Sequence, residues 1–223
     1  LILWWIWVGS GLQKSFKMSV DLLARIGAGL KIIIMLNQKE RQLEHNACSF
    51  SDFALKVYPF LELTKFHQSY YRVLEAFAQG RIQKLIVSVP PQHGKSVGST
   101  TLLPAYMLGL NPDTRIAIAS YSGTLASKFN RRVQRIIESR EYADIFPDTT
   151  IKRGTKPSGY IRTSDEVEII DHKGELISVG REGSLTGNRV DCFILDDLYK
   201  YAMEAQSPVV RENCWEWYTS VVR

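Results

Sequence analysis

Cysteine is scarce in this 223-residue chain, and its three cysteines, Cys48, Cys192 and Cys214, lie far apart in the sequence. An odd number of cysteines cannot all pair within one chain, and this spacing matches no zinc-binding pattern. We therefore expect free thiols in a reducing compartment, and we exclude a small domain held together by disulfides.

Glycine and proline are also few, at 15 and eight residues, which excludes collagen-like and low-complexity chains. Neither sign of charge dominates, because 28 Lys and Arg residues stand against 23 Asp and Glu, for a net charge of +5. This modest excess permits a nucleic-acid partner without requiring one. With 45% hydrophobic and 23% charged residues, the composition is that of an ordinary soluble globular protein with one sizeable core.

Long hydrophobic runs are missing as well. The chain opens with LILWWIWV, but eight residues fall well short of the roughly 20 that span a bilayer. This opening also lacks the basic segment and the small-residue cleavage site of a secretory signal. A second apolar stretch, residues 22–36, is interrupted by two basic residues. We interpret residues 1–36 as an apolar extension from a mis-called start, with Met18 or Met35 as the true one, rather than as a membrane anchor, and we expect no membrane partner.

Beyond this extension, short apolar runs alternate with longer amphipathic stretches, which indicate buried strands and helices respectively. The expected helices are 49–58, 64–79, 96–110, 124–139 and 207–222, and the expected strands are 84–89, 115–120, two within 160–179, and 192–195. We expect Ser51 to cap the first helix and Pro104 to kink the third. Strands that alternate with helices predict an α/β domain over residues 37–223, with a mostly parallel sheet flanked by helices and a helical lead-in at 37–83.

The most informative segment is LIVSVPPQHGKS, residues 85–96, in which a predicted strand runs through a tight loop into a predicted helix. Backbone N–H groups at such a helix start, together with the helix dipole, bind phosphate oxygens. Gly94 would let the backbone approach the phosphates, and Lys95 would reach the β- and γ-phosphates of a nucleotide. The Ser96 hydroxyl would ligate Mg²⁺.

The match to the common phosphate-loop pattern is incomplete. The pattern Gly-x-x-x-x-Gly-Lys-Ser requires glycine at position 89, where this chain has Val89, and Pro90 and Pro91 remove two N–H donors from the early loop. We expect Pro91, Gln92 and His93 to contact the nucleotide with the residues that follow them. A chance Gly-Lys-Ser at a helix cap is the alternative.

A second segment, CFILDD at residues 192–197, is an apolar strand that ends in two carboxylates. Mg²⁺ prefers oxygen ligands and keeps several waters, so an acid at the end of a buried strand beside a phosphate loop can hold the hydrated ion. We assign the metal to Asp196 and activation of the attacking water to Asp197. Two solvated acids at a strand end are the alternative, but the pairing with the loop favours an ATPase.

Basic side chains gather on the predicted helix 124–139 and just after it: Lys128, Arg131, Arg132, Arg135 and Arg140. They indicate either a DNA-backbone contact or an arginine finger, with a solvated helix face as the alternative. Two more arginines, Arg181 and Arg189, flank the glycine-rich stretch before the acidic strand. Either one could approach the γ-phosphate of a neighbouring subunit.

His67 and Gln68 precede a run of aromatic residues. A group of this kind upstream of a phosphate loop can hydrogen-bond to adenine and stack on it, while packing of an N-terminal helix on the sheet explains the same residues. We interpret Trp215 and Trp217 as core or interface residues.

From about Phe66 to its end the chain resembles the ATPase half of a tailed-bacteriophage terminase large subunit. The resemblance rests on the order and spacing of these stretches: RIQKLIVSVPPQHGKS, NPDTRIAIASYS with LASKFNRRVQRIIES, YADIFP, GSLTG, CFILDD and SPVVRENCWEWYTSVV. A proline-containing loop before Gly-Lys-Ser, without the first glycine, is itself typical of that family. The resemblance therefore favours this family over generic kinases and GTPases.

The resemblance implies a P-loop NTPase of the ASCE (RecA-like) class that uses ATP and Mg²⁺ to drive double-stranded DNA through a portal into an empty capsid. It implies a homo-oligomeric ring on the portal protein, a small terminase subunit as a partner, and a location in the host bacterial cytoplasm. Gly94, Lys95 and Ser96 match the phosphate loop, and Gln68 matches the adenine-contacting glutamine. Asp196 and Asp197 match the acidic pair, which in many relatives is Asp-Glu.

Members of that family continue into a coupling motif and a nuclease domain, which this chain does not contain. We therefore expect a sheet that is incomplete at its C-terminal side, and no nuclease activity. Two other interpretations stay open. One is a different P-loop DNA translocase, similar to a helicase; the other is an inactive prophage remnant that only binds nucleotide or partners.

Overall fold

The computed structural model describes residues 6–8, 48–152, 159–185, 187 and 189–221. The expected extension, residues 1–36, lies outside this part of the chain except for residues 6–8, which pair within the sheet as a strand that the sequence did not predict. Among the described residues, no helix combines the length and apolar character needed to cross a membrane.

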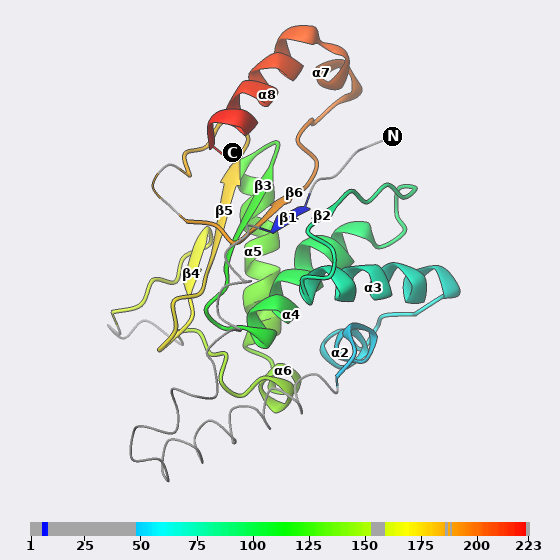
Figure 1. The fold of residues 1–223 in the computed structure, drawn as a ribbon, viewed down its shortest axis with the longest axis vertical. Helices are drawn as coiled ribbons and strands as arrows, with labels where there is room; N and C mark the ends of the chain where they lie inside the picture. The colour runs from blue at the N-terminus through cyan, green and yellow to red at the C-terminus, as the bar shows by residue number, and fades with distance from the viewer. Residues whose placement is uncertain (1–5, 9–47, 153–158, 186, 188, 222–223) are drawn as a thin grey trace, which may run out of the picture.

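A single sheet runs through the molecule in the order β2-β1-β6-β3-β5-β4 (Figure 1). Its strands are β1 (Ile6–Val8), β2 (Lys84–Leu85), β3 (Arg115–Ser120), β4 (Glu166–Glu168), β5 (Glu175–Gly180) and β6 (Cys192–Leu195). Strand β3 pairs in parallel with β5 and β6, while β4 is an antiparallel edge strand on β5. Because β1 is antiparallel to both β2 and β6, β2 runs in the same direction as β6. The expected α/β fold with a mostly parallel, open sheet is therefore confirmed.

The helices are α2 (Phe50–Val57), α3 (Lys65–Ala78), η3 (Val97–Leu102), α4 (Leu103–Leu110), α5 (Gly123–Ile137), α6 (Arg140–Ile145), α7 (Ala202–Gln206) and α8 (Pro208–Val221). The sequence did not predict α6 and α7. The predicted cap of the first helix was wrong, because Ser49 and not Ser51 accepts the hydrogen bond from the Asp52 N–H.

The predicted helix 96–110 is one continuous helical stretch in two parts. After two α-helical residues, 95 and 96, it runs as a π-helical turn, η3, and continues as α4, with Pro104 in the first turn of α4. Proline has no N–H to donate, so it is tolerated where the hydrogen-bond register changes. Short π-helical turns are rare, and they occur frequently at functional sites.

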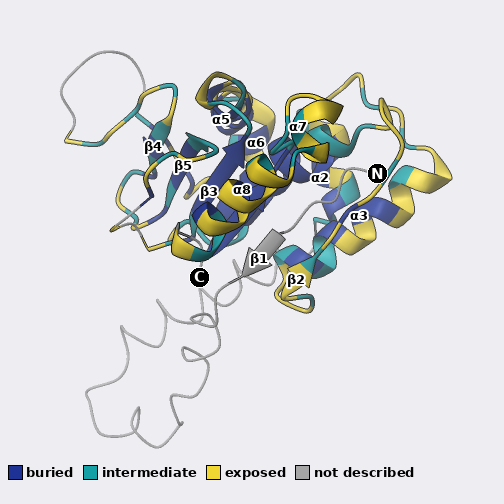
Figure 2. Cartoon of the chain, turned by 90° about the horizontal axis from the view of Figure 1, so that it is seen from above, coloured by how far each residue is buried: buried dark blue, intermediate teal, exposed yellow. Residues whose placement is uncertain are grey.

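Alternate side chains of the central strands build two cores on opposite faces of the sheet. Ile116 and Ile118 of β3 pack with α3, α4 and α5 in the larger core, whereas Ala117 and Ala119 face a smaller cluster that includes Trp217 of α8. This alternation is the ordinary geometry of a strand with both faces covered. The buried residues accordingly lie along the central strands and on the inner faces of the helices that cover them, α2 and α3 included, with exposed residues on the outside (Figure 2).

The predicted strand 84–89 was too long. Only Lys84 and Leu85 pair as β2, and of the residues that follow, Ile86 is 44% exposed while Val87 is buried. The two prolines, Pro90 and Pro91, cannot donate ladder hydrogen bonds, so an extended central strand is not expected next to them. The chain therefore leaves the sheet early and reaches the following loop as irregular backbone.

Candidate functional site

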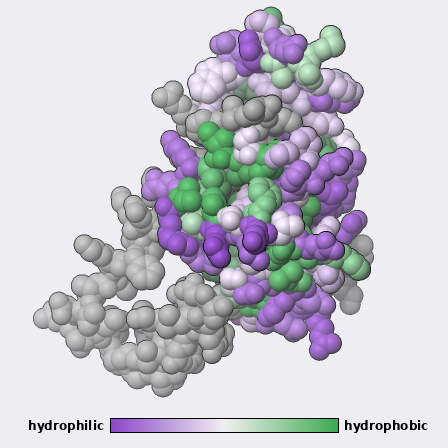
Figure 3. Space-filling view, turned by 90° about the vertical axis from the view of Figure 1, so that its right-hand side faces the viewer, coloured by the Kyte–Doolittle hydropathy of each residue, from purple (hydrophilic) through white to green (hydrophobic). Residues whose placement is uncertain are grey.

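A cavity of about 720 Å³ opens beside the loop that follows β2. It is lined by residues 88–92, residues 94–97 and Asp197. The loop leaves β2 and Asp197 follows β6, so the cavity lies at the carboxyl ends of strands that run the same way, where open α/β sheets bind ligands. Figure 3 shows the side of the molecule that carries this loop, with a patch of apolar side chains in its middle and polar ones around it.

The loop depends on two residues with left-handed backbone conformation. Gln92 has φ 64° and Gly94 has φ 70°. A Cβ atom on Gly94 would also lie 3.3 Å from Nε2 of His67, so both backbone conformation and space favour glycine there. The predicted loop residue His93 donates from Nδ1 to the Pro91 carbonyl oxygen at 2.8 Å, which closes the loop on itself.

Helix α3 supports the loop from behind. The Tyr70 hydroxyl donates to the Lys95 carbonyl oxygen at 3.0 Å, and burial raises the pKa of Tyr70, so the phenol keeps the proton that it donates. Gly98 of η3 packs directly on α3, since a Cβ atom there would lie 2.7 Å from Cε1 of Tyr70 and 3.1 Å from Cε1 of Tyr71. The position of Lys95 and Ser96 is therefore set by α3 as well as by the sheet.

Asp196 is fully buried at the end of β6. Its Oδ2 accepts a hydrogen bond from the Thr100 hydroxyl at 2.6 Å, while its Oδ1 has no hydrogen-bond partner among the described residues. Burial raises the pKa of Asp196 to about 7, the Asp197 carboxylate adds to the rise, and Thr100, Lys95 and Ser96 oppose it. Such a carboxylate is costly unless a further positive group or metal ion compensates it.

Asp197 differs from its neighbour because it is partly exposed and lines the cavity. Its backbone has φ 49°, and its carbonyl oxygen accepts a hydrogen bond from the Tyr121 N–H at 2.8 Å. Burial lowers the pKa of Lys95, and the carboxylates of Asp197 and Asp196 counteract that effect. The structure thus brings Lys95, Ser96 and the two carboxylates together, as the sequence predicted.

Arg181 lies at the same edge of the sheet, just after β5, but its own chain engages it. Its guanidinium donates to the Leu198 carbonyl oxygen at 2.9 Å, lies 3.3 Å from the Glu204 carboxylate, and sits over the Tyr199 ring. This side chain therefore holds the segment that leads from the acidic pair into α7.

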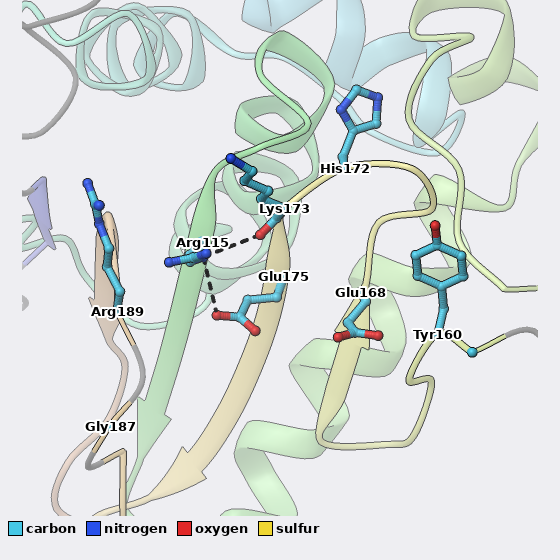
Figure 4. Close-up of a pocket in the computed structure, with 10 residues that line it drawn as sticks. Arg115, Tyr160, Glu168, His172, Lys173, Glu175, Gly187 and Arg189 are labelled. Atoms are coloured by element: carbon cyan, nitrogen blue, oxygen red, sulfur yellow. Dashed lines mark hydrogen bonds and ion pairs between the residues drawn. The ribbon is translucent and has the colours of Figure 1, made fainter.

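Arg189 lies at the opposite edge of the sheet, before β6, and the structure does not bring it near Lys95 in the same chain. It lines a second cavity of about 460 Å³ with Arg115 of β3 and Glu175 of β5 (Figure 4). The Nε of Arg189 is 3.7 Å from the Asp191 carboxylate, and the Nε of Arg115 is 3.8 Å from the Glu175 carboxylate.

The other sequence candidates lie outside the main cavity. Gln68 is exposed on α3, one residue after His67, and it is not among the described residues that line the cavity. The basic side chains of α5 form one exposed stripe: Lys128, Arg131, Arg132 and Arg135. Arg140 is exposed at the start of α6.

Three residues that shape this site were not predicted from the sequence: Thr100, Tyr70 and Gly98. Thr100 binds Asp196 across 96 positions of sequence, and nothing local marks such a pairing. The spacing did place Tyr70 on a helix, but not its contact with the loop. A glycine inside a predicted helix, as at position 98, is the one signal that could have indicated close packing there.

No family model, curated protein or solved structure matches the chain in comparisons with known proteins. A functional assignment therefore rests on the chemistry of the residues themselves.

Proposed function

We propose that the chain is the ATP-hydrolysing motor domain of a phage DNA-packaging terminase, a P-loop NTPase that drives double-stranded DNA into a procapsid. The observation that carries the proposal is the convergence of Lys95 and Ser96 with Asp196 and Asp197 at one cavity, although the two pairs are far apart in sequence. A phosphate-binding loop facing two acids is the arrangement that nucleotide hydrolysis needs.

Each side chain of the cavity has a separate role in the proposed reaction. Lys95 contributes positive charge to the phosphates, and the N–H groups at the start of η3 add donors to them. Asp197, which lines the cavity, accepts a proton from the water whose oxygen attacks the γ-phosphorus as the bond to the β–γ bridging oxygen breaks. The apolar residues Val89 and Val97 exclude other water from the site.

The residues present fit Mg²⁺. Oδ1 of Asp196 is buried without a hydrogen-bond donor among the described residues, and the Ser96 hydroxyl lies close enough to affect the same carboxyl group. Asp196 and Ser96 would hold the ion, which supplies charge neutralisation at the phosphates. Among the described residues no group of three or more His, Cys, Asp or Glu side chains could hold a metal ion, so the phosphates and water would provide the other ligands.

The remaining parts of the proposal concern assembly. The exposed basic stripe on α5 supports a contact with the backbone of double-stranded DNA. A homo-oligomeric ring on the portal protein, with a small terminase subunit as a further partner in the host bacterial cytoplasm, completes the motor. Arg189 and Arg181 are the two candidates for an arginine that acts on a neighbouring subunit.

The first test is ligand-dependent thermal unfolding with Lys95→Ala. ATP with MgCl₂ at about 100 times its Kd stabilises a single-site protein by about 2.7 kcal/mol, so we expect a rise of roughly 5–10 °C in Tm for the unchanged chain. Lys95→Ala should lose this rise, whereas Lys56→Ala, an exposed lysine on α2 away from the cavity, should keep it. Equal shifts in both variants would contradict the phosphate loop.

The second test is phosphate release from ATP with and without double-stranded DNA. DNA-stimulated turnover that Lys95→Ala abolishes supports a motor. Stabilisation by ATP without any turnover would instead identify a chain that only binds nucleotide, and separation of duplex strands would favour a helicase-like translocase.

A further inference from the structure

A third cavity, of about 250 Å³, lies behind the phosphate loop, between the end of α2, the turn η3 and the last turns of α5. Its apolar walls are Val57, Val97 and Ile136. It is separate from the proposed nucleotide cavity, although Val97 contributes to both.

Two arginines make this cavity positively charged. Arg132 and Arg135 line it, both are exposed, and their spacing of three residues places them on the same side of α5. In the part of the chain that the structure describes, neither forms an ion pair, and no carboxylate lines the cavity. The nearby acid Glu138 is already engaged, since its carboxylate lies 2.6 Å from Arg162.

A buried hydroxyl adds a second, independent sign of a ligand. Thr101 lines the cavity, is 2% exposed, and its Oγ1 has no hydrogen-bond partner among the described residues. A buried hydroxyl without a partner is rare in folded proteins and calls for an explanation. A ligand atom in the cavity would provide the missing partner.

The cavity shown in Figure 4 offers a contrast, because charges of both signs line it and two of them, Arg115 and Glu175, lie 3.8 Å apart. The cavity behind the loop has arginines alone. Guanidinium groups bind carboxylates and phosphates through two parallel hydrogen bonds, so the charge and the donors both select an anion.

We propose that this cavity is a binding site for a small organic anion, with one carboxylate or phosphate group on a compact apolar body. The anionic group lies between Arg132 and Arg135, and the body packs against Val57, Val97 and Ile136. The volume is below the 300–1,000 Å³ typical of drug-sized ligands, so the body is about one ring or a short chain.

The test uses phenyl phosphate and phenylacetate as probes, with benzyl alcohol as the neutral control. The protein carries Lys95→Ala, which removes the main positive charge of the phosphate loop, and phenylacetate has no phosphate group to bind there, so its binding is independent of the proposed function. We expect saturable binding of both anions in calorimetry, with NMR shift changes at the amides of Val57, Val97 and Ile136, and no binding of the alcohol.

Matched variants on α5 then locate the site. Arg132→Met and Arg135→Met should each weaken anion binding by about tenfold or more, because each loses a charge-assisted hydrogen bond. Lys128→Met and Arg131→Met remove the same charge from the same helix outside the cavity, and they should leave the affinity unchanged. Equal weakening by all four would overturn the proposal in favour of diffuse attraction to a basic helix.

Thr101→Val tests the hydroxyl group alone, because valine keeps nearly the same shape as threonine. It should raise Tm in the absence of a probe, because the unpartnered hydroxyl is gone, and it should weaken anion binding several-fold. Undetectable binding of both probes to a folded protein, or unchanged affinity in Arg132→Met and Arg135→Met, would overturn the proposal.

Discussion

We call the side of the sheet where the parallel strands begin its amino edge, and the side where they end its carboxyl edge. At the amino edge, charged side chains lie in pairs of opposite sign, whereas at the carboxyl edge the Asp196 carboxyl group is buried with too few hydrogen-bond donors among the described residues. Arg115 lies near Glu175 in a cavity that is open to solvent (Figure 4), and Arg189, which also lines the cavity, lies near Asp191. Asp196, at the other edge, is fully buried, and one of its carboxylate oxygens accepts no hydrogen bond from the described residues.

This difference supports the proposal that the ligand site lies at the carboxyl edge. These ion pairs are partly exposed and their atoms lie 3.7–3.8 Å apart, and such pairs contribute about 0–1 kcal/mol each. Burial also raises the pKa of Glu175, but Arg115 opposes that rise. The Asp196 carboxyl group, whose pKa burial raises to about 7, is costly to ionise at neutral pH, and groups with such shifted pKa values cluster at functional sites.

Asp196→Asn should stabilise the protein while it removes ATP turnover. The amide keeps an acceptor for the Thr100 hydroxyl but carries no charge. Because burial raises the pKa from 3.8 to about 7, and one pKa unit corresponds to about 1.4 kcal/mol, the gain in free energy of unfolding above about pH 7 is at most about 4 kcal/mol. Urea unfolding without metal measures it.

The matched control is Asp191→Asn at the amino edge. Its carboxylate accepts the Arg115 N–H at 3.1 Å and pairs with the exposed Arg189, so its loss should destabilise the chain by less than about 1 kcal/mol. If Asp196→Asn were the more destabilising of the two, the contrast between the edges would be wrong.

The same carboxyl group predicts how stability depends on pH in metal-free protein. The folded-state pKa of Asp196 is raised above its ordinary value of 3.8 to about 7, so between these values the folded chain holds a proton that the unfolded chain releases. Stability from this group should therefore fall as pH rises from about 4 to about 7, by up to about 1.4 kcal/mol per pH unit. Comparison of urea midpoints with those of Asp196→Asn isolates this slope; parallel profiles would contradict it.

Local sequence patterns predicted the elements that carry their own signals. RIAIAS forms β3 over the predicted residues, because an apolar run between turn residues has few other structures available, and CFIL forms β6 for the same reason. The loop residues and the acidic pair were predicted because each group comes directly after an expected strand in the sequence. The pairing of β1 with β2 and β6, the hydrogen bond from Thr100 to Asp196, and the contact of Tyr70 with the loop arise from tertiary packing, which no window of sequence records.

Gly98→Ala should weaken the carboxyl edge by a steric route. The added Cβ would lie 2.7 Å from Cε1 of Tyr70, a buried ring that cannot move without disturbing its hydrogen bond to the Lys95 carbonyl oxygen. We expect a loss of about 1–3 kcal/mol in unfolding free energy and weaker stabilisation by ATP. Gly123→Ala is the control, since its nearest contact would be at 3.9 Å, and it should change stability by no more than about 0.5 kcal/mol.

Arg189→Ala should change the free energy of unfolding least of all these variants. It therefore tests whether the charges at the amino edge contribute to stability. Its side chain is 68% exposed and 3.7 Å from the Asp191 carboxylate, so the free energy of unfolding should change by less than about 0.5 kcal/mol and ATP-dependent stabilisation should persist. Arg181→Ala, which removes contacts with Leu198 and Glu204, should cost more.

The rate of ATP hydrolysis in the two variants then distinguishes the roles of Arg189 and Arg181. Arg181 is held by Leu198 and Glu204 of its own chain, whereas Arg189 is mostly exposed and forms one ion pair, with Asp191. If the proposed function is correct, we therefore expect Arg189 to be the arginine finger, and its loss should reduce DNA-stimulated ATP hydrolysis on the order of 10³-fold. Full turnover in Arg189→Ala, with turnover lost in Arg181→Ala at unchanged ATP binding, would reverse this assignment. It would also confine the chemistry to the carboxyl edge and leave the amino edge with paired surface charges alone.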